Sequence, residues 1–235
     1  MNRPWTSGEP TTGQAPLIRI LIVDDHVVVR RGVADLLNHE PGLVVCGESA
    51  GVTDALSEIA IRKPDVAIVD LSLGAESGLD LIATLAESCP DVRTLVLSAH
   101  DELLFAHRAL KAGARGYVMK TASADELVHA VRRVASGRRY VSEPVSERIL
   151  DTLSGRTTHP DLPSVDRLTN REQQVFMLVG RGLETRQIAD RLSLSVKTVE
   201  SHYAHIKDKL GLGTGRELVR AAVNWTEGSL GRRHE

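Results

Sequence analysis

The chain has 235 residues, enough for one or two domains, and its apolar content of 42% excludes disorder throughout. Two cysteines are too few for a disulfide scaffold, and no apolar run approaches the 18 residues of a membrane span. The net charge of −2 is unevenly divided along the chain. Residues from Ser164 onward have 12 Lys or Arg and 9 Asp or Glu, a net charge of +3, and the preceding residues have 17 and 22, a net charge of −5. This division indicates two modules with different partners.

Residues 1–16 contain three prolines and no apolar core, so we expect a disordered tail rather than a signal peptide. Cys46 and Cys89 stand in apolar surroundings, which predicts buried free thiols. Since the sequence also offers no candidate membrane segment, we expect a cytoplasmic protein that does not bind a membrane.

Short apolar runs alternate with segments of helical periodicity in the first part of the chain. The runs cover residues 19–23, 43–46, 65–69, 94–97 and 116–119, and the helical segments cover about 27–38, 53–62, 77–88, 101–112 and 124–137. Short runs that are apolar on both faces are typical of central strands in a parallel sheet. The alternation predicts an α/β domain over residues 17–138, a doubly wound five-stranded parallel sheet with helices on both faces. A capping-box pattern from Ser123 to Glu126 marks the start of the last helix.

The remainder of the chain lacks strand patterns. We expect a linker over residues 139–164, with one short helix at about 141–153 and Pro144 in its first turn, and with no periodicity at 155–163. A second capping-box pattern, Thr169 to Glu172, begins a helix that ends near Gly180. Further helices are predicted at about 185–191, 196–210 and 216–225. These features predict an all-α four-helix domain over residues 165–228, followed by a tail at 229–235.

Polar side chains follow four of the predicted strands, at the edge where open α/β sheets bind ligands. Asp24 and Asp25 follow the first strand, Asp70 the third, Ser98 the fourth and Lys120 the fifth. One such Asp is more often a helix cap and a lone lysine more often a solvated one, but the combination at four strand ends is rarely coincidental. Three convergent carboxylates repel one another unless a cation binds, and oxygen ligands suit Mg²⁺. The set predicts metal-assisted phosphoryl transfer with Asp70 as the nucleophile.

Residues 17–138 resemble the receiver domain of two-component response regulators, which has a flavodoxin-like fold. The resemblance rests on the Asp24–Asp25 pair, Asp70, Gly78, Ser98 followed by Ala99, Tyr117 and Lys120. It implies that Asp70 accepts a phosphoryl group from a sensor histidine kinase, with Ser98 and Lys120 contacting that group. It also implies that the Mg²⁺ ligands come from Asp25, Asp70 and the backbone carbonyl of Ser72, with Asp24 assisting through water, and that Tyr117 is a switch residue.

The chain departs from the receiver pattern at two loops. Leu73-Gly74 stands where the family often has Met-Pro, and Thr121 follows Lys120 where many members have a proline with a cis bond. A cis bond before Thr121 would cost about 3–4 kcal/mol, so a trans peptide with a shifted loop is the alternative. These differences affect the loop geometry and leave every reactive group in place. Ser72 and His100 occupy positions that tune the dephosphorylation rate in this family.

The two predicted helices at 185–191 and 196–210 are joined by a short turn, as in a helix-turn-helix, and a small helical interaction domain is the alternative. Ser195 can cap the second of these helices and direct its N-terminus toward a phosphate. Together with Leu168–Glu172 and Lys209–Leu212, this stretch resembles the LuxR-type DNA-binding domain. The resemblance implies that the helix after Ser195 enters the major groove of double-stranded DNA. The residues expected near DNA are Lys197, Thr198, Ser201, His202, Tyr203 and His205.

This helix carries few cations, because Glu200, Tyr203 and Ala204 stand where several relatives have Lys or Arg. We therefore expect weak DNA affinity for a monomer, a shallow salt dependence, and binding as a homodimer on an inverted repeat.

Together the two resemblances are those of the NarL/FixJ subfamily of response regulators, which implies a phosphorylation-dependent transcription regulator rather than an enzyme. Two alternatives stay open. A metal-dependent phosphohydrolase would also use Asp70 as nucleophile, but such enzymes usually need a second acid two residues later, where this chain has Ser72. A DNA-binding regulator controlled by protein contacts alone would leave Asp70 unphosphorylated, and the intact acidic pocket argues against it.

Overall fold

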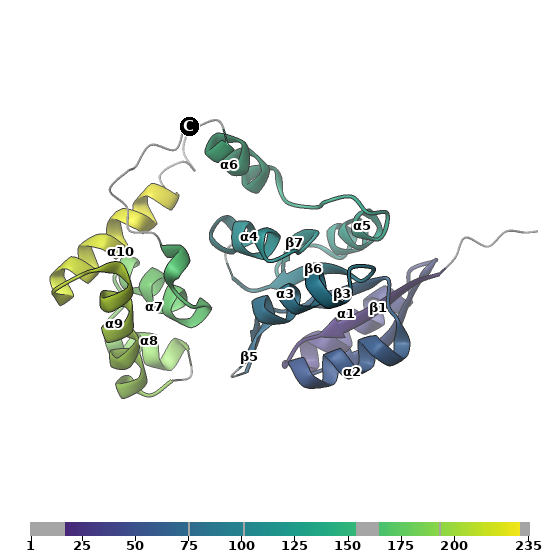
Figure 1. Cartoon of the computed structure of the whole chain (residues 1–235), viewed down its shortest axis with the longest axis horizontal. Coiled ribbons are helices and arrows are strands. Elements are labelled where there is room, and N and C mark those ends of the chain that lie inside the picture. The colour runs from purple at the N-terminus through teal and green to yellow at the C-terminus, as the bar shows by residue number, and fades with distance from the viewer. Residues whose placement is uncertain (1–16, 75, 101, 154–164, 193, 231–235) are drawn as a thin grey trace, which may run out of the picture.

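A five-stranded parallel sheet forms the centre of the first domain in the computed structural model, which describes residues 17–74, 76–100, 102–153, 165–192 and 194–230 (Figure 1). The strand order is β2-β1-β3-β6-β7, and every neighbouring pair is parallel. The strands are β1 (Ile18–Val23), β2 (Leu43–Ser49), β3 (Val66–Val69), β6 (Arg93–Ser98) and β7 (Gly116–Met119). This confirms the predicted doubly wound sheet. The strand order reverses beside β1, so the carboxyl ends of β1 and β3 open a crevice there.

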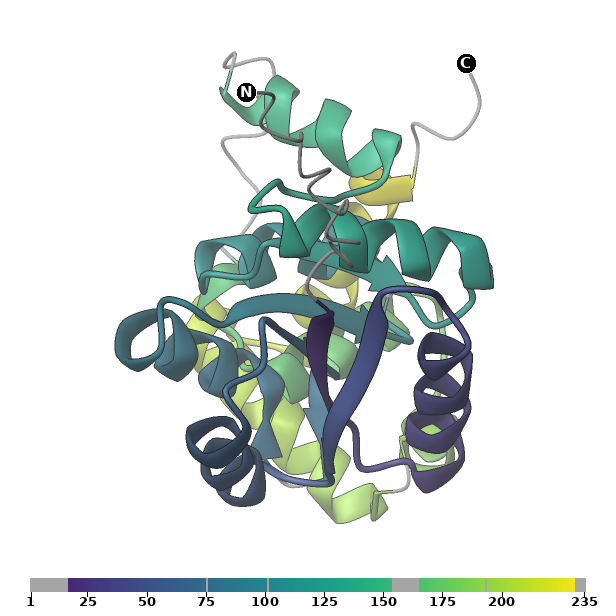
Figure 2. The same ribbon diagram turned by 90° about the vertical axis from the view of Figure 1, so that its right-hand side faces the viewer.

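Helices cover both faces of the sheet, because side chains that alternate along each strand feed two separate cores. Ile20 and Ile22 of β1 belong to the core under α1 (Val27–Asn38) and α5 (Ala124–Ala135). Leu21 and Val23 belong to the opposite core, under α2 (Val52–Arg62), α3 (Gly78–Ser88) and α4 (Glu102–Lys111). Figure 2 shows the sheet between these two layers. Helices on both faces are the predicted arrangement.

Strand β2 is longer than the predicted run at 43–46. The pairing with β1 shifts between Ile20 and Leu21, so that Cys46 is the extra residue of a bulge and the ladder continues through Gly47 to Ser49. A Cβ on Gly47 would lie 2.9 Å from a side-chain atom of each of Leu21, Glu58 and Arg62, so any other residue would force these side chains to shift. Cys46 and Cys89 are free thiols as predicted, but both are half-buried rather than buried.

Residues 139–153 form a strap along the edge of the receiver-like domain. Tyr140 pairs with Gly116 at the edge of β7, and α6 (Glu143–Leu153) packs against α4 with Val145 buried. The Tyr140 hydroxyl donates to Glu126 at 3.1 Å. Ser123 caps α5 by accepting from the Glu126 amide. The Glu126 carboxylate accepts from Tyr140 and not from the Ser123 amide, so only one half of the predicted capping box forms.

The C-terminal domain is helical throughout. It contains η1 (Val165–Arg167), α7 (Asn170–Gly180), α8 (Thr185–Arg191), α9 (Val196–Leu210) and α10 (Gly215–Leu230). The capping box between Thr169 and Glu172 is complete, and Gly211 ends α9 in the left-handed conformation that favours glycine. Helix α10 runs beyond the predicted end at 225, since one glycine inside a helix costs only about 1 kcal/mol. Within the described ranges, no helix is long and apolar enough to cross a membrane.

Several predicted segments cannot be compared with the structure. The N-terminal tail at 1–16, the aperiodic linker at 155–163 and residues 231–235 of the C-terminal tail lie outside the described residues.

Candidate functional site

Three carboxylates meet in the crevice at the ends of β1 and β3. Asp24 and Asp70 are buried, and one ligand atom from each of Asp24, Asp25, His26 and Asp70 lies within 4.8 Å of the others. Asp70 Oδ1 is buried and has no hydrogen-bond partner among the residues the structure describes. A buried carboxylate oxygen without a partner is costly, so it marks a position that a cation or a phosphoryl group can fill.

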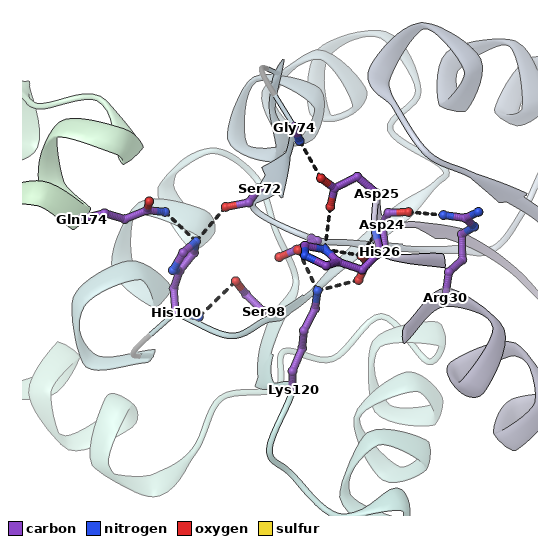
Figure 3. Close-up of polar contacts among 11 residues, drawn as sticks. Asp24, Asp25, His26, Arg30, Ser72, Gly74, Ser98, His100, Lys120 and Gln174 are labelled. Atoms are coloured by element: carbon purple, nitrogen blue, oxygen red, sulfur yellow. Dashed lines mark hydrogen bonds and ion pairs between the residues drawn. The ribbon is translucent and has the colours of Figure 1, made fainter. Parts of the chain in front are cut away.

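Lys120 reaches this crevice from the end of β7 (Figure 3). Its Nζ lies 2.6 Å from Asp24 Oδ2 and 2.7 Å from Asp70 Oδ2. Burial alone would lower the pKa of Lys120, but the hydrogen bonds to Asp24 and Asp70 outweigh that effect and raise it. The ammonium is therefore charged at neutral pH, and it balances part of the carboxylate charge.

The backbone around Asp70 depends on two glycines. A Cβ on Gly78 would lie 1.9 Å from the Asp70 carbonyl oxygen, so no other residue fits there. Gly74 has φ +63°, and its amide donates to Asp25 Oδ2 at 2.9 Å. Gly74 lies in a short hairpin of β4 (Ser72–Leu73) and β5 (Glu76–Ser77), which the sequence did not predict. The second departure from the receiver pattern is Thr121, which follows Lys120 in place of a proline. The Lys120–Thr121 peptide is trans.

His26 is a member of the pocket that sequence analysis missed. Its Nδ1 lies 2.7 Å from Asp25 Oδ1 and 3.3 Å from Asp24 Oδ1. Its only signal in the sequence is its place directly after the Asp24–Asp25 pair. The side chain is 63% exposed, so it stands at the mouth of the crevice.

The loop after β6 connects the crevice to the surface that faces the C-terminal domain. Ser98 is fully buried, and its Oγ accepts from the His100 amide at 3.3 Å. The predicted switch residue Tyr117 is also buried, and its hydroxyl donates to the His100 carbonyl oxygen at 2.9 Å. Ser98 and Tyr117 are therefore both linked to the backbone of His100.

The His100 imidazole bridges the two domains. Its Nε2 lies 2.9 Å from Ser72 Oγ and 2.8 Å from the side-chain nitrogen of Gln174 in α7 (Figure 3). The Gln174 side-chain oxygen accepts from Arg171 at 2.9 Å, so its amide nitrogen points at His100 and donates. Nε2 must then accept, which requires a neutral imidazole protonated on Nδ1. Burial lowers the pKa of His100, in keeping with this form.

Arg108 of α4 makes a second link to the C-terminal domain. Its guanidinium donates to the Leu168 carbonyl oxygen at 2.9 Å and to the side-chain oxygen of Gln173. A cleft of about 670 Å³ lies between the two domains, and His202 of α9 is among its lining residues. The first domain is therefore hydrogen-bonded to α7 and Leu168, and the cleft separates it from His202 of α9, the helix that carries the predicted DNA contacts. Sequence analysis did not identify this interface.

The predicted DNA contacts lie on α9 with different exposures. Ser195 caps the helix by accepting from the Thr198 amide at 3.0 Å, as predicted. Tyr203 is half-buried against the C-terminal core, with its hydroxyl 3.4 Å from the Thr185 hydroxyl. Of the other predicted DNA contacts, three are exposed (Lys197, Ser201 and His205) and two are half-buried (Thr198 and His202).

Comparison with known proteins gives a match for each domain. Residues 20–132 match the response regulator receiver domain, and residues 166–222 match the luxR family of bacterial regulatory proteins. The chain is 36% identical over 213 residues to the DNA-binding transcriptional activator DevR/DosR of Mycobacterium tuberculosis, which covers 90% of this chain and 95% of that protein. It is 34% identical over 211 residues to the oxygen regulatory protein NreC of Staphylococcus epidermidis, with 88% and 97% covered. Among solved structures, the chain is similar to that of two RcsB dimers bound to two parallel DNAs, with a TM-score of 0.53 and 25% identity. The match covers 88% of this chain and 98% of the RcsB chain.

Proposed function

Because the chain belongs to the NarL/FixJ-type response regulators of two-component systems, which carry a LuxR-type DNA-binding domain, we propose that Asp70 is its phosphoacceptor. A sensor histidine kinase would be the phosphodonor. The observation that carries the proposal is the state of the Asp70 carboxylate, which is buried with Oδ2 held by Lys120 and Oδ1 without a hydrogen-bond partner among the described residues.

The pocket supplies the parts that phosphoryl transfer needs. An Asp70 oxygen attacks phosphorus, the bond from phosphorus to the donor's leaving nitrogen breaks, and an acyl phosphate forms. Lys120, already beside Asp70, pairs with the added negative charge, and Ser98 is available as a hydrogen-bond donor. Asp24, Asp25, Asp70 and the Ser72 carbonyl would hold Mg²⁺, which when bound offsets the negative charge that develops on the phosphoryl oxygens.

The DNA contacts follow from α9. Lys197, Ser201 and His205 are exposed on it, and the capped N-terminus of the helix favours a phosphate. The charge of Lys209 is already balanced by Glu172, with Nζ 2.7 Å from Oε2, so Lys209 adds little to the positive charge that α9 offers to DNA. Two α9 helices on an inverted repeat would double the contacts, and the similar protein RcsB binds DNA as a dimer, which supports binding as a dimer here.

Phosphorylation would act by releasing α7, and with it the whole C-terminal domain, from the receiver. A phosphoryl group on Asp70 draws Ser98 toward it, and His100 is hydrogen-bonded to Ser98 through its amide. Movement of this loop weakens the bond between His100 and Gln174. The C-terminal domain then separates, and His202 leaves the cleft.

The test is incubation of the full chain with a small phosphodonor and Mg²⁺, followed by intact-mass measurement. We expect the mass of one phosphoryl group to be added, to be removed by base, and to be absent in Asp70→Asn. The matched control is Asp91→Asn, an exposed aspartate outside the pocket, which should be labelled like the parent. Label that persists in Asp70→Asn would reject the assignment.

Two further measurements address the alternatives. Equal DNA affinity for the parent and Asp70→Asn, with and without phosphodonor, would favour a regulator controlled by protein contacts alone. Turnover of phosphate monoesters would favour a phosphohydrolase. We expect phosphodonor to strengthen DNA binding of the parent alone, and no monoester turnover.

A further inference from the structure

A second cluster of metal-ligating side chains lies in the C-terminal domain, away from the acidic pocket. It consists of Glu172 in α7 and of His202 and His205 in α9. One ligand atom from each of the three residues lies within 4.8 Å of the others. The two histidines are three residues apart, so they share one face of α9. That face borders α7, so the Glu172 carboxylate comes close to both imidazoles although the His205 side chain is exposed.

The hydrogen bonding of the cluster is incomplete. His202 Nδ1 is buried and has no hydrogen-bond partner within the described part of the chain. His205 Nδ1 lies 3.9 Å from Glu172 Oε1, which is too far for a hydrogen bond. A buried ring nitrogen that faces no partner is unusual in a folded protein, so it indicates a position for a ligand.

We propose that Glu172, His202 and His205 bind a divalent transition metal ion of the Zn²⁺ class. Two imidazole nitrogens and one carboxylate oxygen are a common Zn²⁺ ligand set, and they leave the fourth position to water. Ligand atoms on a tetrahedral Zn²⁺ are about 3.3 Å apart for bonds of about 2.0–2.1 Å. Small side-chain rotations on two packed helices close the cluster to that size. The nitrogen ligands disfavour Mg²⁺ and Ca²⁺.

Lys209 competes for this site, where the Thr169 amide also donates to Glu172 Oε2 at 2.7 Å and leaves Oε1 as the oxygen for the metal. Its Nζ lies 2.9 Å from Glu172 Oε1 and 2.7 Å from Oε2, so the ammonium now balances the carboxylate. The Lys209 side chain is 35% exposed and can turn into solvent when a divalent ion takes its place. The lysine therefore sets the affinity of the site, and its removal should strengthen metal binding.

The consequence for DNA rests on the proposed function. If α9 enters the major groove, then His202 and His205 are needed both by the metal and by DNA. Metal binding then lowers DNA affinity, and by linkage DNA lowers metal affinity to the same extent. This control would act independently of Asp70.

The first experiment measures Zn²⁺ binding to the full chain against a chromophoric chelator, in excess Mg²⁺ and without DNA or phosphodonor. We expect one Zn²⁺ per chain, and at least tenfold weaker binding in His205→Gln. The side chain of His205 is 65% exposed, so its replacement leaves the core intact, which the thermal midpoint verifies. The control is His107→Gln, an exposed histidine on α4, which should bind like the parent. Unchanged binding in His205→Gln would overturn the proposal.

Two further readouts identify the ligands. Co²⁺ in place of Zn²⁺ should give the intense visible absorption of a tetrahedral site in the parent and in His107→Gln, and lose it in His205→Gln. Lys209→Met should bind Zn²⁺ about tenfold more tightly, and weaker binding would overturn the proposed competition. Because no DNA is present, failure of the proposed DNA-reading role of α9 would leave these results unchanged. The DNA link is tested separately, by the Zn²⁺ dependence of DNA affinity in the parent and in His205→Gln.

Discussion

The hydrogen bond from Gln174 to His100 joins the two domains, so its removal should shift the balance between docked and undocked forms. Gln174→Ala deletes the donor and leaves His100 bonded to Ser72 alone. A neutral hydrogen bond contributes about 1 kcal/mol, and 1.4 kcal/mol corresponds to a factor of ten. The undocked population should therefore rise about fivefold.

The assay is DNA affinity of the full chain, measured by fluorescence anisotropy on a fragment selected by the protein itself. If only the undocked form binds DNA, the apparent Kd is inversely proportional to its population. The unphosphorylated variant should then bind about fivefold more tightly than the unphosphorylated parent. After treatment with phosphodonor the two should differ less, because phosphorylation has already released the domains.

A second variant removes the same bond from the other domain. His100→Ala should also strengthen DNA binding without phosphodonor, and the double variant should show little more effect than either single change. Fully additive effects would mean that the residues act separately. If Gln174→Ala left the affinity of the unphosphorylated protein unchanged, docking through this bond would not limit DNA binding, and the reasoning would fail.

Three further predictions concern the first domain. Gly78→Ala should destabilise it by about 3 kcal/mol or more in urea unfolding, because the new Cβ meets the Asp70 carbonyl, whereas Gly32→Ala, with open space around it in α1, should stabilise it by about 0.5–1 kcal/mol. Lys120→Met should lower stability by about 3 kcal/mol in chelator, because it leaves buried carboxylates unpaired, and added Mg²⁺ should restore most of the loss in the same assay. Burial and a hydrogen bond to a carboxylate raise the pKa of Tyr140 to about 12. The stabilisation of the fold by the protonated Tyr140 hydroxyl is therefore fully present below about pH 10 and is lost as the pH rises from there toward about 12. The urea unfolding midpoints of the parent and of Tyr140→Phe should converge over that range.

The acidic pocket was predictable because each of its members stands at the end of an apolar run. Parallel strands bring those ends to one edge, so Asp24, Asp70 and Lys120 were expected together, and the structure places the Lys120 ammonium against both carboxylates. The prediction needed only periodicity and chain order. His26 was missed because a histidine that follows a strand carries no periodic signal.

The domain interface could not be predicted in the same way. Glu172, Gln173 and Gln174 are consecutive polar residues in α7, which the sequence suggests as a solvated stretch, yet all three are buried. The partners of Gln173 and Gln174 are far away in the chain, because Arg108 and Gln173 are 65 positions apart and His100 and Gln174 are 74 positions apart. The hairpin of β4 and β5 has two residues in each strand, too few for a strand pattern to appear.

The interface has the strength that a switch requires. Its hydrogen bonds include those from Arg108 to Gln173 and Leu168, and the one from Gln174 to His100. At about 1 kcal/mol for the neutral bond and about 1.5–3 kcal/mol for each bond from the Arg108 guanidinium, these bonds contribute several kcal/mol, which is comparable with the roughly 5.5 kcal/mol that a shift from 1:99 to 99:1 needs. A new phosphoryl charge beside Lys120 can shift the equilibrium from docked to undocked only if the free energy of docking is no larger than this. The loop from Ser98 to His100 belongs to both the pocket and the interface, and Ser72 on the neighbouring strand end contacts His100 as well, so phosphorylation and docking act on the same short segments.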